Sequence, residues 1–469
     1  MLFNSVHFLI FFIILYVAYI SAKCRIQNIL LLVGGWIFYS FWDVKMSFLL
    51  LFSIIFNFYL GKKISISNVK KHFLVFGIVV NLLILIIFKY TLFLSHVFND
   101  VFLAIGQAKP IPILSIVLPV GISFYTFHNI SYIVDVYKNR ILPTNSIITF
   151  SIYDLFFPLL LAGPIERAEN LIPQIEEERK LNFYNFYSGG ILFVWGIFKK
   201  VFVADNLSGF VNASLDPNNQ IPEGMIYYSA FCFAFQVYAD FSGYTDAARG
   251  LAKMMGFRLS HNFLIPFISS NPSEFWKRWH ISLSTWLRDY LYIPLGGNRI
   301  GLFRQNINLI IVWVIGGLWH GATYGYLIWG FYCGIQIVLY NLLFRYASTY
   351  FKSIPNFVQK FTKYVGVFLT FWLFALGLLL FRVENLFHLE RILTNLSGIY
   401  FSLSLFLKII FFISPIIVVQ SFQLYKKEME ILNFKSLHPL VLISLIILFS
   451  VQFSLFGVFE HREFFYFQF

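Results

Sequence analysis

The chain has 469 residues, of which 59% are hydrophobic, 21% aromatic and 12% charged, and its formal net charge is +13. A soluble globular domain carries roughly 25% charged residues, so this composition excludes a soluble protein and indicates an integral membrane protein. Short basic loops between apolar segments account for the positive charge. We therefore expect the lipid bilayer as a partner and no nucleic acid.

Apolar segments recur along the chain and predict an all-α, polytopic membrane protein. Several are shorter than the roughly 20 residues of a full crossing, so we expect about eleven or twelve transmembrane helices with additional re-entrant and interfacial helices. No polar stretch is long enough for a separate domain, so residues 1–469 are expected to form one membrane domain. Its motifs and its polar residues within apolar segments concentrate at about 119–330, which is where we expect any chemistry. The segments lie at about 6–21, 28–42, 46–60, 73–89, 111–127, 146–162, 186–204, 223–240, 304–318, 322–344, 364–381, 403–421 and 439–458.

The basic residues predict an orientation. Lys23 and Arg25 follow the first segment, and Lys62 and Lys63 follow the third, so alternate loops are the basic ones. Basic loops face the cytoplasm, which places the N-terminus outside. Two basic clusters near the other end, at 352–363 and 426–435, place the C-terminus outside as well. The first segment lacks a basic leading region and is expected to be retained rather than cleaved.

Two carboxylates, Asp240 and Asp246, lie in apolar company in the run Gln236-Val-Tyr-Ala-Asp-Phe-Ser-Gly-Tyr-Thr-Asp246. Asp246 and Arg249 are three residues apart, and an i,i+3 ion pair is the structural interpretation. Glycoside or metal chemistry is the alternative. Neither fits well, because no sugar-cleft domain exists and no histidine stands at metal-ligand spacing, so we expect no metal.

The block from Glu274 to Gly297 predicts an amphipathic interfacial helix. An aromatic and leucine stripe recurs at helical spacing, and basic residues lie round the other side. His280 falls on the aromatic side, which an interfacial helix does not explain, so it is a candidate to work with His320. The stripe consists of Trp276, Trp279, Leu283, Trp286, Leu287 and Tyr290.

His320 stands in Gly-Gly-Leu-Trp-His-Gly-Ala (316–322), inside an apolar run of more than thirty residues. An ionisable side chain at membrane depth is costly and usually functional. Gly316, Gly317 and Gly321 permit a helix break or a close approach of substrate to the backbone. The structural alternative is a neutral histidine with its hydrogen bonds satisfied inside the bundle.

Together these residues resemble the membrane-bound O-acyltransferase family, in its bacterial branch similar to alginate and peptidoglycan O-acetyltransferases. The resemblance covers nearly the whole chain, and its specificity comes from the order and co-occurrence of the motifs. They are Pro119-Val-Gly-Ile-Ser-Phe-Tyr-Thr-Phe127, Ser131-Tyr-Ile-Val-Asp-Val-Tyr137, Phe157-Pro-Leu-Leu-Leu-Ala-Gly-Pro-Ile165, Tyr238 to Asp246, Trp276 to Gly297 and Trp319-His-Gly321.

The resemblance implies a bundle around a central tunnel and an acyl thioester donor, acetyl-CoA or another, arriving from the cytoplasm, with no bound cofactor. The family's nearly invariant histidine corresponds to His320, and its second polar position to His280. Attack of a hydroxyl on a thioester needs a base, and a positioned imidazole typically contributes about 10² to 10⁴ in rate. The residues expected to bind substrate are Trp319, Trp276, Trp279, Asp240, Asp246, Arg288 and Asp289.

The tail Phe464-Phe-Tyr-Phe-Gln-Phe469 has two interpretations. Its composition alone predicts an aromatic interfacial anchor. It also resembles the tail of the small partner peptide of teichoic acid D-alanylation systems, whose tyrosine is proposed to carry the acyl group. Tyr466 is the matching residue, and its phenol, with a pKa of about 10, would form an ester that passes its acyl group on readily.

The sequence therefore predicts an O-acetyltransferase of the cytoplasmic (inner) membrane that modifies an extracytoplasmic polysaccharide. We expect a periplasmic or surface acetyltransferase of the SGNH-hydrolase type to complete the transfer. The residue composition hints at an AT-rich genome, which favours peptidoglycan over an alginate-like exopolysaccharide. A teichoic acid D-alanyltransferase and, from another class, a transporter or flippase are the alternatives.

Overall fold

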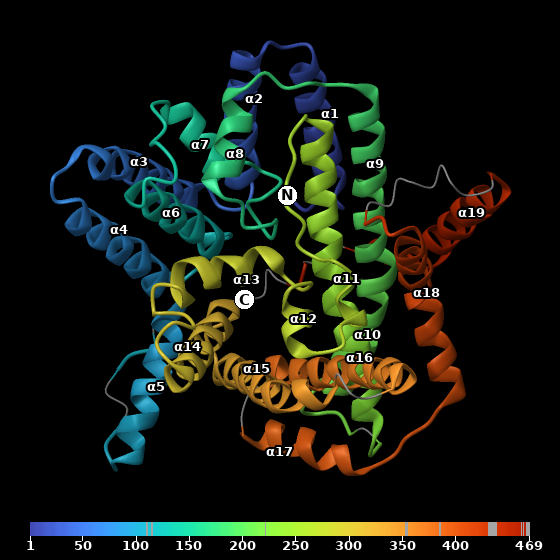
Figure 1. The fold of residues 1–469 in the computed structure, drawn as a ribbon. Helices are drawn as coiled ribbons and strands as arrows, with labels where there is room; N and C mark the ends of the chain where they lie inside the picture. The colour runs from blue at the N-terminus through green and yellow to red at the C-terminus, as the bar shows by residue number, and fades with distance from the viewer. Residues whose placement is uncertain are drawn as a thin grey trace. The chain divides into compact units, whose positions relative to one another are not determined.

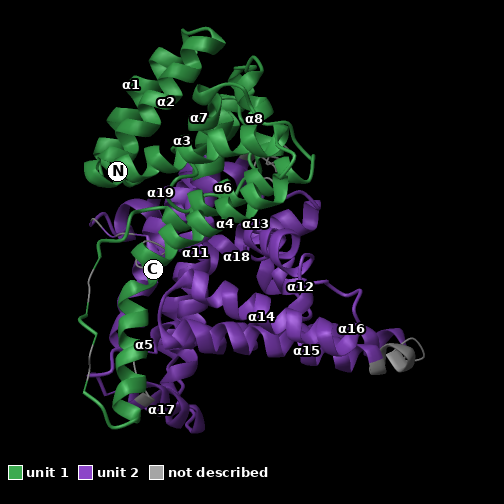
Figure 2. Ribbon diagram, turned by 90° about the vertical axis from the view of Figure 1, so that its left-hand side faces the viewer, with its two compact units in different colours: residues 1–189, 248–260 green, residues 190–247, 261–469 purple. Residues whose placement is uncertain are grey.

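The computed structural model describes residues 1–108, 111–113, 116–220, 222–351, 355–383, 386–429, 439–460, 462 and 464–465. Every regular element in these ranges is helical (Figure 1), which confirms the predicted all-α membrane fold. The chain forms two compact units, coloured separately in Figure 2. Unit 1 comprises residues 1–189 and 248–260, and unit 2 comprises residues 190–247 and 261–469.

Unit 1 is built from the N-terminal helices. Helix α3 is preceded by Asp43, whose side chain accepts hydrogen bonds from the backbone N–H groups of Lys45 and Met46 and so caps the first turn. Its helices are α1 (Val6–Ile20), α2 (Cys24–Ser40), α3 (Val44–Ile66), α4 (Lys70–Leu85), η1 (Ile86–Tyr90), α5 (Thr91–Ala104), α6 (Ile122–Tyr137), α7 (Ile147–Leu155) and α8 (Ala168–Glu176).

Two helices, α9 (Phe183–Phe198) and α11 (Met225–Met254), contribute residues to both units. The remaining helices belong to unit 2. They are η2 (Lys199–Ala204), α10 (Asp205–Leu215), η3 (Pro266–Ile268), α12 (Pro272–Trp276), α13 (Ile281–Leu287), η4 (Arg288–Tyr292), α14 (Leu302–His320), α15 (Tyr324–Phe351), α16 (Asn356–Leu378), η5 (Leu379–Arg382), α17 (Leu386–Thr394), η6 (Asn395–Ser397), α18 (Leu403–Lys426) and α19 (Pro439–Phe456).

Seven helical segments of the described ranges are long and apolar enough to cross a membrane. We predicted about eleven or twelve from apolar runs, and the difference lies in helix length. Several of those runs form helices of 9 to 17 residues, such as α2 with 17 and α7 with 9. The seven are Val44–Ile66, Lys70–Ala104, Phe183–Leu215, Leu302–His320, Tyr324–Arg345, Asn356–Arg382 and Leu403–Lys426.

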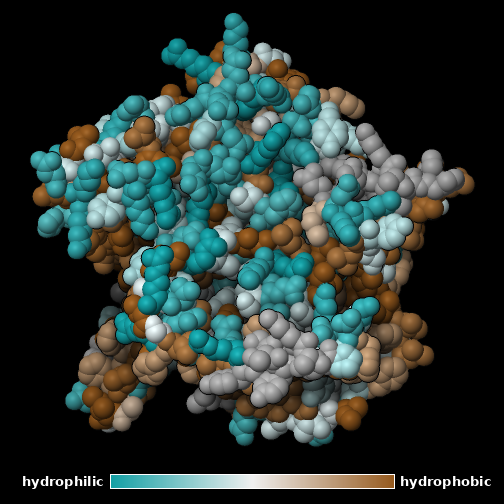
Figure 3. All heavy atoms as spheres, viewed as in Figure 1, coloured by the Kyte–Doolittle hydropathy of each residue, from teal (hydrophilic) through white to brown (hydrophobic). Residues whose placement is uncertain are grey.

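Large apolar side chains lie on the surface, where Figure 3 shows them in brown. On α16 the exposed residues Phe357, Phe361, Tyr364 and Phe368 recur at helical spacing, while Phe374 is buried. Such an exposed aromatic face would be a liability in water. It suits a lipid environment, in which the hydrocarbon covers the face.

Candidate active site

His280 stands at a break between two short helices. Asn271 caps α12 by accepting a hydrogen bond from the backbone N–H of Glu274 at 2.8 Å. The chain then turns, and His280 adopts a left-handed backbone conformation (φ 44°, ψ 54°) as the N-cap of α13. A non-glycine residue rarely adopts this conformation, which is common at functional sites. The continuous helix that we predicted through this block is therefore wrong.

The predicted aromatic stripe nevertheless is the inward side of this segment. Trp276, Trp279 and Trp286 are buried, whereas Lys277 and Arg288 are exposed. The break keeps the burial pattern because each short helix packs its apolar face inward independently. The helical spacing of the apolar residues therefore predicted correctly which side chains are buried before and after the break, although it did not predict the break itself.

Asn262 holds the His280 ring. Its side-chain oxygen accepts hydrogen bonds from the backbone N–H of Ser282 at 3.2 Å and from the Ser282 hydroxyl at 2.9 Å. The same oxygen lies 3.2 Å from His280 Nδ1. Since the Ser282 N–H can only donate, the oxygen end of the amide must point here, and Nδ1 must carry the hydrogen. A neutral His280 then has its lone pair on Nε2.

The backbone strengthens this arrangement. Ile281 donates its N–H to the carbonyl oxygen of Asn262 at 3.0 Å, and Leu264 donates to the carbonyl of Arg278 at 2.9 Å. The segment 262–264 thus runs along the turn that presents His280. Asn262 is linked to the turn through its backbone as well as through its side chain, so its position is well defined.

His320 is the last residue of α14, so a helix end, one of the two possibilities that the glycines left open, is observed here. Gly321 follows in an extended conformation, and a Cβ atom there would collide with the Tyr326 ring. Gly317 lies directly against the backbone of α15, which allows α14 and α15 to pack closely. Close contacts with Tyr326 and with the backbone of α15 therefore require glycine on both sides of the histidine.

The two histidines come together inside unit 2. Their ring centroids are 6.2 Å apart, and the Trp319 ring lies 5.7 Å from His280 and 5.0 Å from His320. His280 and His320 are both buried. Burial lowers the pKa of His280 well below its usual value, and the nearby His320 lowers it further. A neutral imidazole is the form that can accept a proton.

Aromatic rings enclose the histidine pair. Phe241 packs edge-on against His280 at 4.7 Å, while Trp329 and Phe381 pack against His320 at 5.3 and 5.7 Å. These surroundings limit water around the pair, which favours acyl transfer over hydrolysis. Phe241, Trp329 and Phe381 were absent from our predicted site, because an aromatic residue in an apolar segment carries no signal of its own.

The predicted tryptophans occupy different places around this pair. Trp319 lies beside both histidines, and Trp276 is one ring further away, 5.9 Å from Trp329. Trp279 packs against Phe263 and Phe374, at 5.1 and 4.6 Å. Trp319 is therefore the best placed of the three to contact a substrate, and the others support the wall behind it.

The two predicted aspartates pair with lysines. Asp240 accepts from Lys200 Nζ at 2.8 Å, and Asp246 accepts from Lys199 Nζ at 2.7 Å. Lys200 also lies 2.9 Å from Asp205. Both lysines are buried. We predicted a local partner for Asp246 in Arg249, which stays a prediction, and the structure shows a lysine from a distant part of the chain as a partner of Asp246.

The remaining predicted site residues differ in placement. Arg288 and Asp289 form an ion pair with each other at 2.7 Å, and the Arg288 side chain is 58% exposed. Tyr466 lies outside the described residues. Lys199 and Lys200 were missed, although two lysines in an apolar segment are a signal that could have identified them. Asn262 was also missed, because one asparagine in a loop has no distinguishing pattern.

Comparisons with known proteins show which family the chain is similar to. Residues 138–381 match the model of the MBOAT, membrane-bound O-acyltransferase family, and this range contains both histidines. A probable alginate O-acetylase of Pseudomonas aeruginosa is 40% identical over 394 residues, covering 82% of this chain and 73% of the relative. The peptidoglycan O-acetyltransferase of Helicobacter pylori is 33% identical over 398 residues, covering 79% and 73%.

A more distant relative is the teichoic acid D-alanyltransferase of Bacillus subtilis. It is 28% identical over 284 residues, which cover 57% of this chain and 69% of the relative. The family model and the extent of the alginate and peptidoglycan matches confirm the resemblance that the motifs indicated. The chain is a multi-pass membrane enzyme that belongs to the membrane-bound O-acyltransferase family.

Proposed function

We propose that this enzyme takes an acetyl group from acetyl-CoA, or from another cytoplasmic acyl thioester, and delivers it for O-acetylation of an extracytoplasmic polysaccharide. The observation that carries the proposal is the convergence of His280 and His320, 40 residues apart in the sequence, to a centroid distance of 6.2 Å. The relatives named for alginate and peptidoglycan acetylation support acetyl as the acyl group.

In this mechanism His320 is the general base. Its imidazole accepts the proton of the attacking hydroxyl as the new C–O bond forms at the thioester carbonyl. The tetrahedral intermediate then collapses, the C–S bond breaks, and the imidazolium returns the proton to the leaving thiolate. His280 orients the substrate or adjusts the basicity of His320. Asn262 determines the tautomer of His280.

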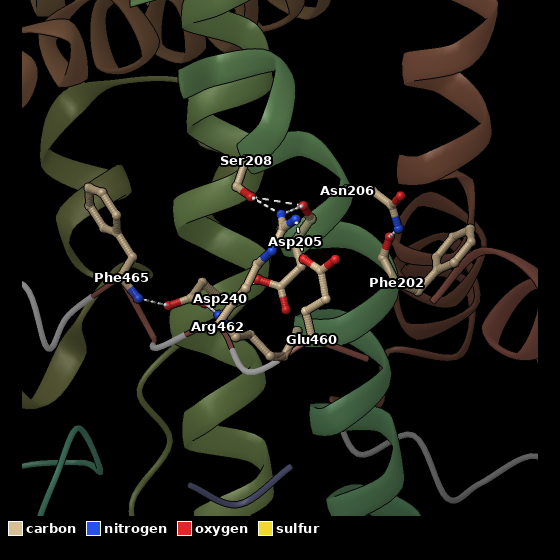
Figure 4. Close-up of polar contacts among 9 residues, drawn as sticks. Phe202, Asp205, Asn206, Ser208, Asp240, Glu460, Arg462 and Phe465 are labelled. Atoms are coloured by element: carbon tan, nitrogen blue, oxygen red, sulfur yellow. Dashed lines mark hydrogen bonds and ion pairs between the residues drawn. The ribbon is translucent and has the colours of Figure 1, made fainter. Parts of the chain in front are cut away.

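The attacking hydroxyl is proposed to be that of Tyr466, which would carry the acetyl group as a phenyl ester. An SGNH-hydrolase-type partner outside the cytoplasmic membrane would then transfer the group to the polysaccharide. Supporting this role, the residues just before Tyr466 are held in unit 2, where the Phe465 N–H donates to Asp240 at 2.8 Å (Figure 4). The basic loops support the placement of both termini outside.

D-Alanyl transfer is the second candidate, favoured by the relationship to the teichoic acid enzyme. The two functions differ in their donor. The purified protein should become labelled by acetyl-CoA carrying a radioactive acetyl group, and not by a D-alanyl carrier protein. The reverse pattern would establish D-alanyl transfer, while transport of an unmodified substrate without labelling would favour the transporter alternative.

The acceptor is tested in cells. Mass analysis of the cell-wall and capsule sugars of a deletion strain should show loss of O-acetyl groups from one polysaccharide, and this identifies the acceptor as peptidoglycan or an alginate-like polymer. A gene encoding His320→Ala should fail to restore acetylation. His388→Ala is the matched control, because His388 is a buried histidine on α17 outside the pair. Unchanged O-acetylation in the deletion strain would refute the proposal.

A further inference from the structure

Unit 2 contains a polar cavity of about 480 Å³ beside the described end of the chain. Helix α10 contributes Asp205 and Ser208, α11 contributes Gln236 and Asp240, and Phe465 forms part of the wall. Its exposed residues Gly209 and Asn212 mark the opening. The volume is within the usual range for small-ligand sites.

Two buried acceptor atoms in this lining have unmet hydrogen-bonding capacity. Asp205 Oδ2 and Gln236 Oε1 have no hydrogen-bond partner among the described residues, and their side chains belong to residues only 3% and 5% exposed. A buried acceptor without a donor is costly. Both residues line the cavity, so a ligand bearing O–H or N–H donors would satisfy them there.

The charges of the lining narrow the ligand class. Three cationic side chains, Lys200, Arg382 and Arg462, stand against the two carboxylates of Asp205 and Asp240. A phosphate group is disfavoured, because the two unsatisfied acceptors and the carboxylates would repel its oxygen atoms. A free ammonium group is disfavoured as well, because the three cationic side chains outnumber the two carboxylates. A sugar hydroxyl donates and accepts at once, so neighbouring carboxylate, amide and guanidinium groups suit it.

The polar framework of the cavity is already organised. Arg462 donates to the Ser208 hydroxyl at 3.1 Å and to the Asp205 carbonyl at 3.0 Å (Figure 4). Lys200 is held between the two carboxylates at 2.8 and 2.9 Å. A ligand would therefore meet groups that are fixed before it binds, which reduces the entropy lost on binding.

The cavity lies next to the histidine pair. At two places, one residue packs on a histidine and the residue next to it in the sequence lines the cavity. Phe241 packs on His280, and the preceding residue, Asp240, lines the cavity. Phe381 packs on His320, and the following residue, Arg382, lines the cavity. The cavity and the proposed catalytic centre thus share one turn of α11 and one turn of η5.

We propose that this cavity is a carbohydrate-binding subsite that holds a sugar unit of the acceptor on the transferase itself. The identification of the sugar as part of the acceptor rests on the proposed function. The cavity would then hold the polysaccharide next to the described end of the chain. It assigns binding roles to Asp205 and Gln236 that the acyl-transfer chemistry does not use.

The experiment measures binding directly by isothermal titration calorimetry on the full-length protein in detergent. The probes are tri-N-acetylglucosamine, which is neutral, and a mannuronic acid trimer, which is acidic. At least one should bind saturably. Gln236→Met keeps the length of the side chain and removes the acceptor, so it should weaken binding roughly threefold to tenfold. Asp205→Asn should weaken it roughly tenfold to hundredfold, because a charged acceptor contributes more.

Ser229→Ala is the matched control on α11, since the Ser229 hydroxyl donates to the Met225 carbonyl within the helix. It should bind as the wild type does. Variants are compared only where size-exclusion profile and melting temperature match the wild type. Binding that is insensitive to both Asp205→Asn and Gln236→Met would overturn the assignment.

Failure of this proposal is distinguishable from failure of the proposed function. If neither probe binds to a preparation that is still labelled by the acetyl donor, the subsite is refuted and the acetyltransferase stands. If a probe binds and no labelling occurs, the subsite stands and the acetyltransferase fails. Binding that develops only in Tyr466→Ala would show that the tyrosine, rather than a sugar, supplies the hydroxyl, and would also overturn the proposal.

Discussion

The side-chain oxygen of Asn262 lies 3.2 Å from Nδ1 of His280, while the same oxygen accepts two hydrogen bonds from Ser282. Two independent donors from Ser282 keep this oxygen in place. The histidine ring consequently has a fixed orientation and a fixed tautomer before any substrate arrives.

Replacing Asn262 should therefore impair catalysis without changing substrate affinity greatly. Asn262→Ala should lower kcat by about 100-fold, because a small misplacement of a positioned group has such an effect. Asn262→Asp keeps an acceptor and should retain more activity. Its carboxylate favours the protonated imidazole, so the acidic limb of the pH–rate profile should move to higher pH. An unshifted profile would mean that Asn262 does not act through His280.

The two histidines should behave as one unit. His320→Ala should reduce acetyl transfer by about 10² to 10⁴, and His280→Ala should reduce it severely as well. The double variant should be little worse than His320→Ala, since residues that act together are not additive. Initial rates of label transfer from the acetyl donor give the comparison. Multiplicative losses would assign His280 a separate, structural role.

Tyr466→Phe separates the two interpretations of the tail. If Tyr466 carries the acetyl group, loss of one oxygen should abolish transfer to the polysaccharide, whereas a membrane anchor tolerates phenylalanine. Labelled donor without acceptor or partner should leave an alkali-labile label on a C-terminal peptide of the wild type. Phe465→Leu is a control that alters the neighbouring side chain and leaves the phenol. Full activity of Tyr466→Phe would leave the tail as an anchor or docking element.

Buried Lys200 is expected to contribute to the free energy of unfolding. Lys200→Met leaves the carboxylates of Asp205 and Asp240 without their shared partner, and breaking a buried pair costs about 3 to 5 kcal/mol. Arg288→Gln breaks an exposed pair and should cost about 0 to 1 kcal/mol. Unfolding of both variants in the same detergent tests the contrast. Equal stability of Lys200→Met and wild type would show that the carboxylates are protonated or solvated.

Local sequence patterns predicted the membrane class, the association of His280 with His320 and the buried face of the Trp276 to Trp286 segment. It did not predict the helix break at His280, because the same stripe suits one long helix or two short ones. The break depends on segment 262–264, which pairs with the turn through backbone hydrogen bonds. Such pairing between separate segments leaves no periodic signal.

The contact between Lys199 and Asp246 illustrates the same limit. A residue three positions away is the nearest candidate by spacing, while Lys199 is 47 residues away and reaches it only after α9, η2 and α11 have packed. Direct contact between Gly196 and the Gly243 backbone permits that packing. Contacts of this kind are decided by tertiary structure, and no local rule identifies them.

Lys199 and Lys200 also impose an order on biogenesis. The carboxylates that neutralise them on α11 are synthesised 47 and 40 residues later. At 5 to 20 residues per second, the ribosome needs roughly 2 to 9 s to reach them. During that interval an isolated segment 183–215 would carry two ammonium groups into hydrocarbon with only the carboxylate of Asp205, beside Lys200, to compensate them, and this is costly. The segment is therefore expected to wait at the translocon and to enter the bilayer together with α11, as a preassembled hairpin whose charges already cancel.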